Sequence, residues 1–395
     1  MSESAMAAEF RRDLRAWLAE NCPAGVRDGA APSVETTPWG SSSIELDRDS
    51  RVWLERMAER GFTVPTWPVE YGGAGLERDL YPVLIDELKR INARAPLTGR
   101  GVNYIGPTIL ELGTDEQKAR WLPGIARGEG GWAMGYSEPG AGSDLASLCC
   151  RAELNGDHYV INGRKVWTSD AMDCDYIFIL ARTDVTAPKH KGISLILVDM
   201  HQPGVQVSPI RLLSGASPFN ETVFVDAIAA ATDVIGGVNN GWTVGKRLLQ
   251  FERSTHAGIN TSGSQGGRTE DSELPARLKP YLHDQPALRR ALCAQQMAVA
   301  AQRLTQQRVI EETAANAPGF ASSAVKLSNA LITQAGDELQ IAALGTQGVG
   351  WDGAFTADEL SATRTWLKQK SLTIAGGTME VQKNIIAKRV LGLPD

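Results

Sequence analysis

The sequence predicts an α+β multidomain protein with an N-terminal helical domain, a middle antiparallel β domain and a C-terminal helical bundle. Apolar residues recur at helical spacing up to about residue 130, alternate with polar residues between about 150 and 230, and return to helical spacing near 240. The expected domains are 1–130, 131–235 and 236–395. A chain of 395 residues is long enough for two or three hydrophobic cores.

The N-terminal third has the apolar spacing of amphipathic helices. Phe10, Leu14, Trp17 and Leu18 repeat at this spacing, and similar patterns predict helices around 53–57 and 80–88. Thr114 and Gln117 are spaced as a capping box, which predicts that a helix begins there. Segment 66–75 is rich in Pro and Gly, and irregular structure is expected for it.

The middle third has the signals of short strands joined by turns. Residues 151–168 alternate between apolar and polar, and they contain two Asn-Gly pairs, at 155–156 and 162–163, which favour tight hairpin turns. Four further strands are expected, at 175–182, 192–199, 204–209 and 221–226. So many short strands indicate a small antiparallel barrel or sandwich.

The last third is expected to be helical again from Trp242 onward. The composition of residues 259–268 is typical of a loop or linker. Long helices are expected at about 285–315 and 321–343, and a final helix at about 378–391.

Composition excludes several classes of protein. With 40 Lys and Arg against 46 Asp and Glu, the net charge is −6, which argues against binding to nucleic acid or anionic lipid. No run of eighteen apolar residues is present, so no membrane span is expected. Five cysteines and five histidines show no metal-binding spacing. These features predict a soluble cytoplasmic protein.

The most informative segment is the glycine-rich stretch from Gly135 to Asp144. Its glycines allow the backbone to approach a ligand closely, and the hydroxyls of Ser137 and Ser143 can donate to carbonyl or phosphate oxygens. The alternative interpretation is a Gly- and Pro-rich turn that joins two domains.

Three segments resemble the acyl-CoA dehydrogenase family. They are Ser-Glu-Pro-Gly-Ala-Gly-Ser-Asp at 137–144, Asn-Gly-Arg-Lys-Val-Trp-Thr-Ser at 162–169, and Ala-Gly-Gly-Thr-Met-Glu-Val-Gln at 375–382. Weaker matches at 67–73, 113–118 and 237–242 extend the resemblance over nearly the whole chain. It implies the same order of domains, helical, β and helical.

The resemblance implies an FAD enzyme that oxidises an acyl-CoA thioester to its α,β-enoyl form and passes electrons to an electron-transfer flavoprotein. Ser137 would bond near the flavin pyrimidine ring, Trp167 would pack against the ring system, and Ser169 matches a Thr that reaches its redox-active edge. Ser143 would contact both cofactor and CoA. The implied cofactor-binding residues are Met134, Tyr136, Ser137, Gly142, Ser143, Trp167, Thr168, Ser169, Gly345, Thr378 and Glu380. For Gly345, a plain helix stop is an equal alternative.

The catalytic base departs from the commonest family pattern. Many members carry Glu where this chain has Gly376, which offers only its backbone N–H to the thioester carbonyl. Other branches place the base on a C-terminal-domain helix just before an Arg, and Glu252 holds that position here. Arg253 would orient the base or meet the CoA tail, and Gly376 and Gly377 would bind substrate. The alternative is a solvated Glu–Arg pair on a helix surface.

A second departure is the missing Arg-x-x-Phe-Gly segment, through which many homotetrameric members reach a neighbouring FAD. Residues 259–273 hold Gly, Ser and acidic residues instead. This pattern resembles actinobacterial-type members that act on bulky or steroid-side-chain CoA esters, some of them α2β2 heterotetramers; simple divergence of a loop is the alternative. Besides an active dehydrogenase, two functions stay open, a non-catalytic partner subunit of a heterotetramer and a flavin acyl-CoA oxidase.

Overall fold

The computed structural model describes residues 4–27, 40–77, 79–256, 269–314 and 321–394. The side chains at 252–256, 269–272, 310, 312–314 and 321–322 lie outside this description. The chain divides into two compact units. The first holds the N-terminal helices, the β-sheet and most of helix α6, and the second holds the remaining helices together with the loop 211–217.

The N-terminal helices follow the predicted apolar spacing. Leu14, Leu18, Trp53, Met57 and Leu84 are all buried in one cluster, which accounts for the apolar faces of three of these helices. The helices are α1 (Ala5–Asn21), α2 (Arg48–Glu59), α3 (Tyr81–Arg90), α4 (Gly106–Leu112) and α5 (Asp115–Arg127). The sequence signals missed α4 and the π-helical turn before it, Gly101–Ile105.

Helix α5 begins with the predicted capping box. The Gln117 N–H donates to the Thr114 hydroxyl (3.2 Å), and the Thr114 N–H donates to Gln117 Oε1 (2.9 Å). The Gln117 amide nitrogen also donates to the carbonyls of Thr232 and Val234, at 2.7 and 2.8 Å. One side chain therefore caps the helix and fastens it to the end of the β region.

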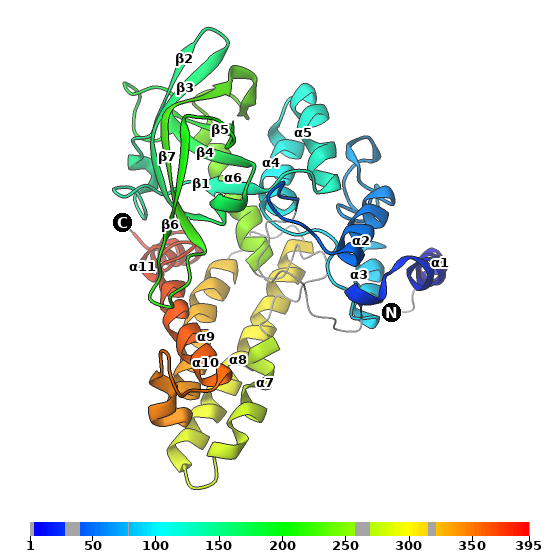
Figure 1. The fold of residues 1–395 in the computed structure, drawn as a ribbon, viewed down its shortest axis with the longest axis vertical. Helices are drawn as coiled ribbons and strands as arrows, with labels where there is room; N and C mark the ends of the chain where they lie inside the picture. Colours follow the sequence, from blue (N-terminus) through cyan, green and yellow to red (C-terminus); the bar gives the residue numbers. More distant parts are fainter. Residues whose placement is uncertain (1–3, 28–39, 78, 257–268, 315–320, 395) are drawn as a thin grey trace. The chain divides into compact units, whose positions relative to one another are not determined.

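The middle segment forms one hydrogen-bonded sheet, drawn mainly in green in Figure 1. Its order is β6-β7-β3-β2-β4-β5-β8, and β1 pairs in parallel with β4. The other long pairings are antiparallel, as predicted. The strands are β1 (Trp132–Gly135), β2 (Arg151–Asn155), β3 (His158–Ser169), β4 (Tyr176–Arg182), β5 (Ile193–Asp199), β6 (Val205–Ile210), β7 (Phe219–Ala230) and β8 (Val234–Ile235).

One of the two predicted hairpin turns is wrong. Asn155-Gly156 does turn between β2 and β3, but Asn162-Gly163 lies within β3, where its pairing with β7 shifts register. Gly163 has a φ of +147°, and a Cβ there would lie 2.7 Å from the Cys150 Cα. Glycine is therefore needed at this position because a β-bulge forms here and the backbones of two strands approach each other closely.

Helix α6 (Gly241–His256) packs against the sheet with the face that includes Val244 and Leu248, both fully buried.

The second unit contains two long helices, α8 and α9, that run side by side in Figure 1. Gln302 Nε2 of α8 donates a hydrogen bond to the Val325 carbonyl of α9 at 3.0 Å. The helices of the second unit are α7 (Thr269–Leu278), α8 (Pro286–Ala314), α9 (Ala321–Leu344), α10 (Ala357–Gln369) and α11 (Met379–Ile385).

The predicted helices around 285–315, 321–343 and 378–391 are therefore confirmed, whereas α7 and α10 were missed. The predicted linker 259–268 lies outside the described residues. Among the described helices, none combines the length and the apolar composition that crossing a bilayer demands.

Candidate active site

The loop after strand β1, residues 136–144, exposes its glycines. Glu138 and Ala141 exchange two backbone hydrogen bonds, of 3.1 and 3.0 Å, which close a tight turn. Gly142 and Ser143 beyond this turn are exposed, and a Cβ on Gly142 would meet no atom within 4 Å. The loop thus presents its backbone and a hydroxyl group to an incoming ligand without steric cover.

A buried ion pair holds this loop against strand β3. Lys165 Nζ lies 2.7 Å from Glu138 Oε1 and 3.2 Å from the Tyr136 carbonyl oxygen. The Lys165 side chain is fully buried and that of Glu138 is 8% exposed. The Glu138 carboxylate also accepts the N–H groups of Cys149 and Cys150, at 2.7 and 2.9 Å. Because all these groups are hydrogen-bonded, the buried charges are tolerated and the loop is fixed in place.

Trp167 lies at a second bulge in β3, where the pairing with β7 shifts between Lys165 and Thr168. Its φ is +61°, a left-handed conformation that is uncommon for a bulky residue. The indole is 55% exposed and packs edge-on against Phe219, with ring centroids 6.2 Å apart. The bulge therefore turns a large, flat apolar surface outward, and a planar ring system could stack on it.

The loop and the bulge lie beside each other. The Val166 N–H donates to the Ser137 carbonyl at 2.9 Å, which places Ser137 next to the residue before Trp167. Ser137 and Ser169 are both half-buried, so part of each side chain is accessible. Two hydroxyls, an exposed indole and open glycine backbone are thus gathered on neighbouring segments of the first unit.

Three other predicted cofactor residues are more enclosed. The Tyr136 ring is buried and packs edge-on against Phe178, and Met134 is half-buried beside the same core. Thr168 is fully buried, and its hydroxyl has no hydrogen-bond partner within the described residues. Tyr136 and Thr168 could therefore offer a ligand their backbone rather than their side chains.

The basic loop 189–191 contacts the end of the glycine loop. The Lys189 ammonium forms an ion pair with Asp144, and the Ser147 hydroxyl donates to the same carboxylate at 2.6 Å. These two hydrogen bonds lower the pKa of Asp144. The His190 ring lies against Trp242 of α6, with centroids 4.8 Å apart.

In the second unit, Gly376 and Gly377 form the turn before α11. Their φ values are +67° and +98°, in the region that favours glycine. Thr378 caps α11 by accepting the Val381 N–H at 3.2 Å, and Lys326 Nζ donates to the Gly377 carbonyl at 2.7 Å. The turn is therefore held rigidly by a helix cap and a lysine.

Two further predicted cofactor residues in this unit are exposed. Glu380 lies in the first turn of α11, where its backbone N–H and the Thr378 hydroxyl lower its pKa. Gly345 begins a 3₁₀ turn directly after α9, at a φ of +58°, and a Cβ there would meet nothing within 4 Å. The position is compatible with a helix stop and with close approach by a ligand.

The predicted base Glu252 and its neighbour Arg253 lie in helix α6, but their side chains fall outside the described part of the chain. Position 252 follows Leu248 and Gly245 at the i+4 and i+7 spacing of one helical face. Both of those residues are buried.

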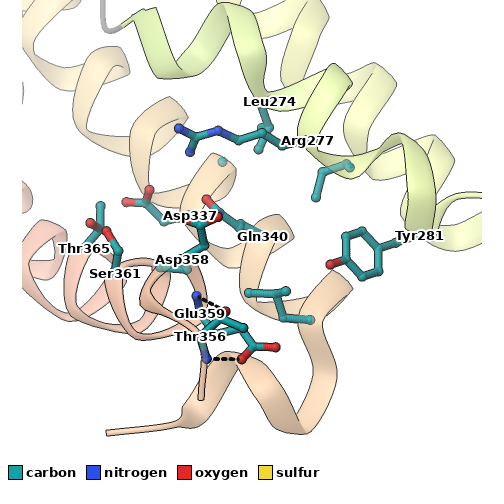
Figure 2. Close-up of a pocket in the computed structure, with 14 residues that line it drawn as sticks. Leu274, Arg277, Tyr281, Asp337, Gln340, Thr356, Asp358, Glu359, Ser361 and Thr365 are labelled. Carbon is teal, nitrogen blue, oxygen red and sulfur yellow. Dashed lines mark hydrogen bonds between the residues drawn. The ribbon is translucent and has the colours of Figure 1, made fainter. Parts of the chain in front are cut away.

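A groove of about 510 Å³ lies between α7, α9 and α10 (Figure 2), and none of the predicted site residues lines it. It combines Arg277 with three carboxylates, those of Asp337, Asp358 and Glu359. Glu359 is engaged in the capping box of α10, with Thr356. The excess of carboxylates opposes binding of a pyrophosphate or a CoA phosphate there.

Sequence reasoning did not identify the roles of three charged residues beside the site, Lys165, Arg100 and Asp170. Lys165 lies in the motif at 162–169 but was not singled out as the partner of Glu138. Arg100 donates from both terminal nitrogens to Asp170, which directly follows Ser169. The available signal for Lys165 was its alternation in phase with the apolar residues Tyr159 and Ile161 along strand β3, where a buried charge needs a partner.

The comparisons with known proteins agree with these observations. Residues 8–129 match the model of the acyl-CoA dehydrogenase N-terminal domain, 133–227 that of the middle domain and 239–391 that of the C-terminal domain. The chain is 38% identical over 389 residues to the acyl-CoA dehydrogenase IpdE1 of Mycobacterium tuberculosis, covering 98% of this chain and 97% of the relative. It is 32% identical over 223 residues to the mitochondrial isovaleryl-CoA dehydrogenase of Pongo abelii, about half of each chain.

Solved structures give the same result. The Tcur3481-Tcur3483 steroid ACAD aligns with a TM-score of 0.76 at 30% identity, covering 100% of this chain and 99% of that one. The ChsE4-ChsE5 complex from Mycobacterium tuberculosis aligns with a TM-score of 0.73 at 27% identity, again covering 100% and 99%. The predicted fold class is confirmed. With all three domain models matched in order along one chain, this protein belongs to the acyl-CoA dehydrogenase family, the flavin-dependent oxidoreductases that act on CH–CH donors.

Proposed function

We propose that this chain is a cytoplasmic, FAD-dependent enzyme that removes the α and β hydrogens of an acyl-CoA thioester. The observation that carries the proposal is the Trp167 bulge, which exposes an indole beside the open glycine loop. The left-handed backbone of Trp167 costs about 1–3 kcal/mol, and such strain is retained mainly where function needs it. Stacking against a flavin ring would explain an aromatic residue at that position.

The residues of the first unit fit a flavin. The loop offers backbone and hydroxyl donors at Gly142 and Ser143, while Ser137, Trp167 and Ser169 lie on adjoining segments. Met134 of β1, Tyr136 of the glycine loop and Thr168 of β3 would complete this side. Gly345, Thr378 and Glu380 are further proposed cofactor-binding residues, within the second unit. When bound, the flavin would accept the β-hydrogen of the substrate as a hydride.

Glu252 would take the α-proton. Position 252 follows Gly245 and Leu248, which are both buried, at helical spacing. An apolar environment would raise a carboxylate pKa toward the range useful for a base. Gly376 has no side-chain acceptor, but its N–H and that of Gly377 could polarise the thioester carbonyl. Arg253 would orient Glu252 or meet the CoA tail.

The substrate we propose is a bulky acyl-CoA, of the steroid-side-chain type. Two similar solved structures are named as a steroid ACAD and a two-component complex, which motivates this class for the present chain. Gly376 leaves room beside the reacting carbons in the family arrangement. The assembly would be a homo-oligomer or an α2β2 heterotetramer with a partner chain, and an electron-transfer flavoprotein would accept the electrons. The alternatives remain a non-catalytic partner subunit and an acyl-CoA oxidase.

Anaerobic titration of the purified chain with a panel of CoA esters tests the proposal. We expect stoichiometric FAD and bleaching of its absorbance by a bulky ester. Glu252→Gln should abolish bleaching but keep FAD, whereas Glu20→Gln, an exposed carboxylate on α1, should change neither. Undiminished bleaching by Glu252→Gln would remove this residue from the mechanism. Substoichiometric FAD without reduction would indicate the partner subunit, and peroxide release in air would indicate the oxidase.

A further inference from the structure

Arg100 and Asp170 form an ion pair next to the predicted flavin edge. Both terminal nitrogens of Arg100 lie 3.2 Å from one carboxylate oxygen of Asp170. The side chains are 19% and 26% exposed, so the pair is partly shielded from solvent. Arg100 precedes the π-helical turn of the N-terminal helices, while Asp170 directly follows Ser169 on the β-sheet.

The segment that Asp170 ends is strained at both ends. Trp167 has a φ of +61° and Asp170 a φ of +56°, so two non-glycine residues in left-handed conformations flank Thr168 and Ser169. Such conformations persist only where surrounding contacts hold them. The residue before Trp167 is tied to the glycine loop through the Ser137 carbonyl, and a matching restraint is needed at the other end.

Asp170 provides that restraint. Its N–H donates to the Pro218 carbonyl at 2.9 Å, and its carbonyl accepts the N–H of Asp173 at 3.0 Å. Arg100 adds the only restraint on this carboxylate that comes from the helices, among the described residues.

We propose that Arg100 and Asp170 are a positioning pair for the flavin. They hold Ser169 and Trp167 in place, and because their opposite charges cancel each other, the pair adds no net charge beside the reduced ring. This inference rests on the proposed function. It yields a prediction that a purely structural role does not make. Removing either partner leaves the other as an unpaired charge, and the two unpaired charges have opposite signs.

The first experiment measures the reduction potential of the flavin in FAD-loaded variants. Asp170→Asn keeps the shape and tolerates the left-handed backbone, and it leaves Arg100 positive, which favours the reduced flavin. Arg100→Gln leaves Asp170 negative and disfavours it. We expect shifts of opposite sign, each about tenfold in the equilibrium constant for two-electron reduction, which corresponds to about 30 mV. Shifts of the same sign, or none in either variant, would overturn the proposal.

The chain offers a matched control. Arg120 and Asp233 also join an N-terminal helix to the β region, at 2.9 Å, and neither contacts a predicted flavin residue within the described structure. Arg120→Gln and Asp233→Asn should leave the potential unchanged. Arg100→Lys, which keeps the charge but loses the two-pronged contact, should stay close to the wild-type potential. A Lys variant that matches Arg100→Gln would contradict the role of charge.

The second experiment uses the protein without flavin, so that it stands apart from the proposed function. Amide hydrogen exchange at Asp170 and Asp173 should quicken at least fivefold in Arg100→Gln and Asp170→Asn, but not in the Arg120 control. Unchanged exchange would refute the positioning role even in an active enzyme. If the wild-type chain binds no FAD while both variants still exchange faster than wild type, the proposed function is refuted and the positioning of this segment is supported.

Discussion

Lys165 and Glu138 meet at 2.7 Å inside the protein, 27 residues apart in the chain, with their side chains 0% and 8% exposed. One comes from strand β3 and the other from the glycine loop. The geometry of the loop that is expected to face the flavin therefore depends on a buried pair of charges.

Removing either charge of this pair should destabilise the protein strongly. Lys165→Met leaves Glu138 buried with only backbone partners, and Glu138→Gln leaves the Lys165 ammonium without its counter-charge. Each single variant should lose about 3–5 kcal/mol of unfolding free energy. The double variant should lose clearly less than the sum, because no buried charge then remains unpaired. Urea denaturation measures all three, and additive losses would contradict the pairing.

Glu87 gives a prediction about the stability of the folded protein at low pH. Its side chain is 1% exposed, and burial alone would raise its pKa, but hydrogen bonds from Arg15, Arg11 and Arg90 lower the pKa to about 2. A carboxyl group whose pKa falls on folding stabilises the folded state above its unfolded value of 4.5, and that stabilisation is lost as the pH falls toward 2.

Glu87→Gln should therefore cost about 2–3 kcal/mol at pH 7, since Arg15 and Arg90 are half-exposed and partly screened. The difference from wild type should shrink steadily below pH 4.5. Thermal melts between pH 7 and pH 3 measure it. A difference that stays constant over this range would show that the variant acts through packing rather than charge.

Trp167→Gly should separate stability from flavin binding. Glycine adopts the left-handed backbone without strain, and the 55% exposed indole contributes limited burial, so the flavin-free protein should melt within a few degrees of wild type or above it. Flavin affinity should fall at least tenfold because the stacking surface is lost. Differential scanning fluorimetry and flavin titration measure the two effects, and retained affinity would argue against stacking.

Gly377→Ala should disturb the turn before α11. Its φ of +98° lies outside the left-handed region open to alanine, and a Cβ would lie 2.8 Å from Gln382 Nε2. Gln382 is almost fully buried and has little room to move. We expect a loss of about 1–3 kcal/mol.

Gly345→Ala serves as its control, because a φ of +58° and open space around the Cβ limit its cost to about 1 kcal/mol. Equal losses in the two variants, measured by thermal unfolding, would show that the contact with Gln382 is unimportant.

The order of helical, β and helical regions could be predicted from the sequence because amphipathic spacing is local. The Asn162-Gly163 prediction failed because the same dipeptide suits a hairpin turn and a bulge, and the close approach of Cys150 decides between them. Helices α7 and α10 were missed because they are short and mostly polar, with few buried residues among the side chains that the structure describes.

The candidate site could likewise be predicted only where its signals are local in the sequence. The glycine loop and Trp167 could be found because their motifs are contiguous. The partners of Lys165 and Asp170 could not, since Glu138 and Arg100 lie 27 and 70 residues away and nothing local pairs them. A tertiary contact of this kind is visible only once the sheet brings its strands together.

Gln117 has a consequence for how this chain can diverge. At most helix starts of this type Glu and Gln are interchangeable, because the cap needs only an acceptor oxygen. Here the amide nitrogen also serves the carbonyls of Thr232 and Val234, and a carboxylate would set negative charge against both of them. Gln117→Glu is therefore expected to be unfavourable here although the two residues are usually interchangeable as caps, and related sequences that keep this contact should keep the amide.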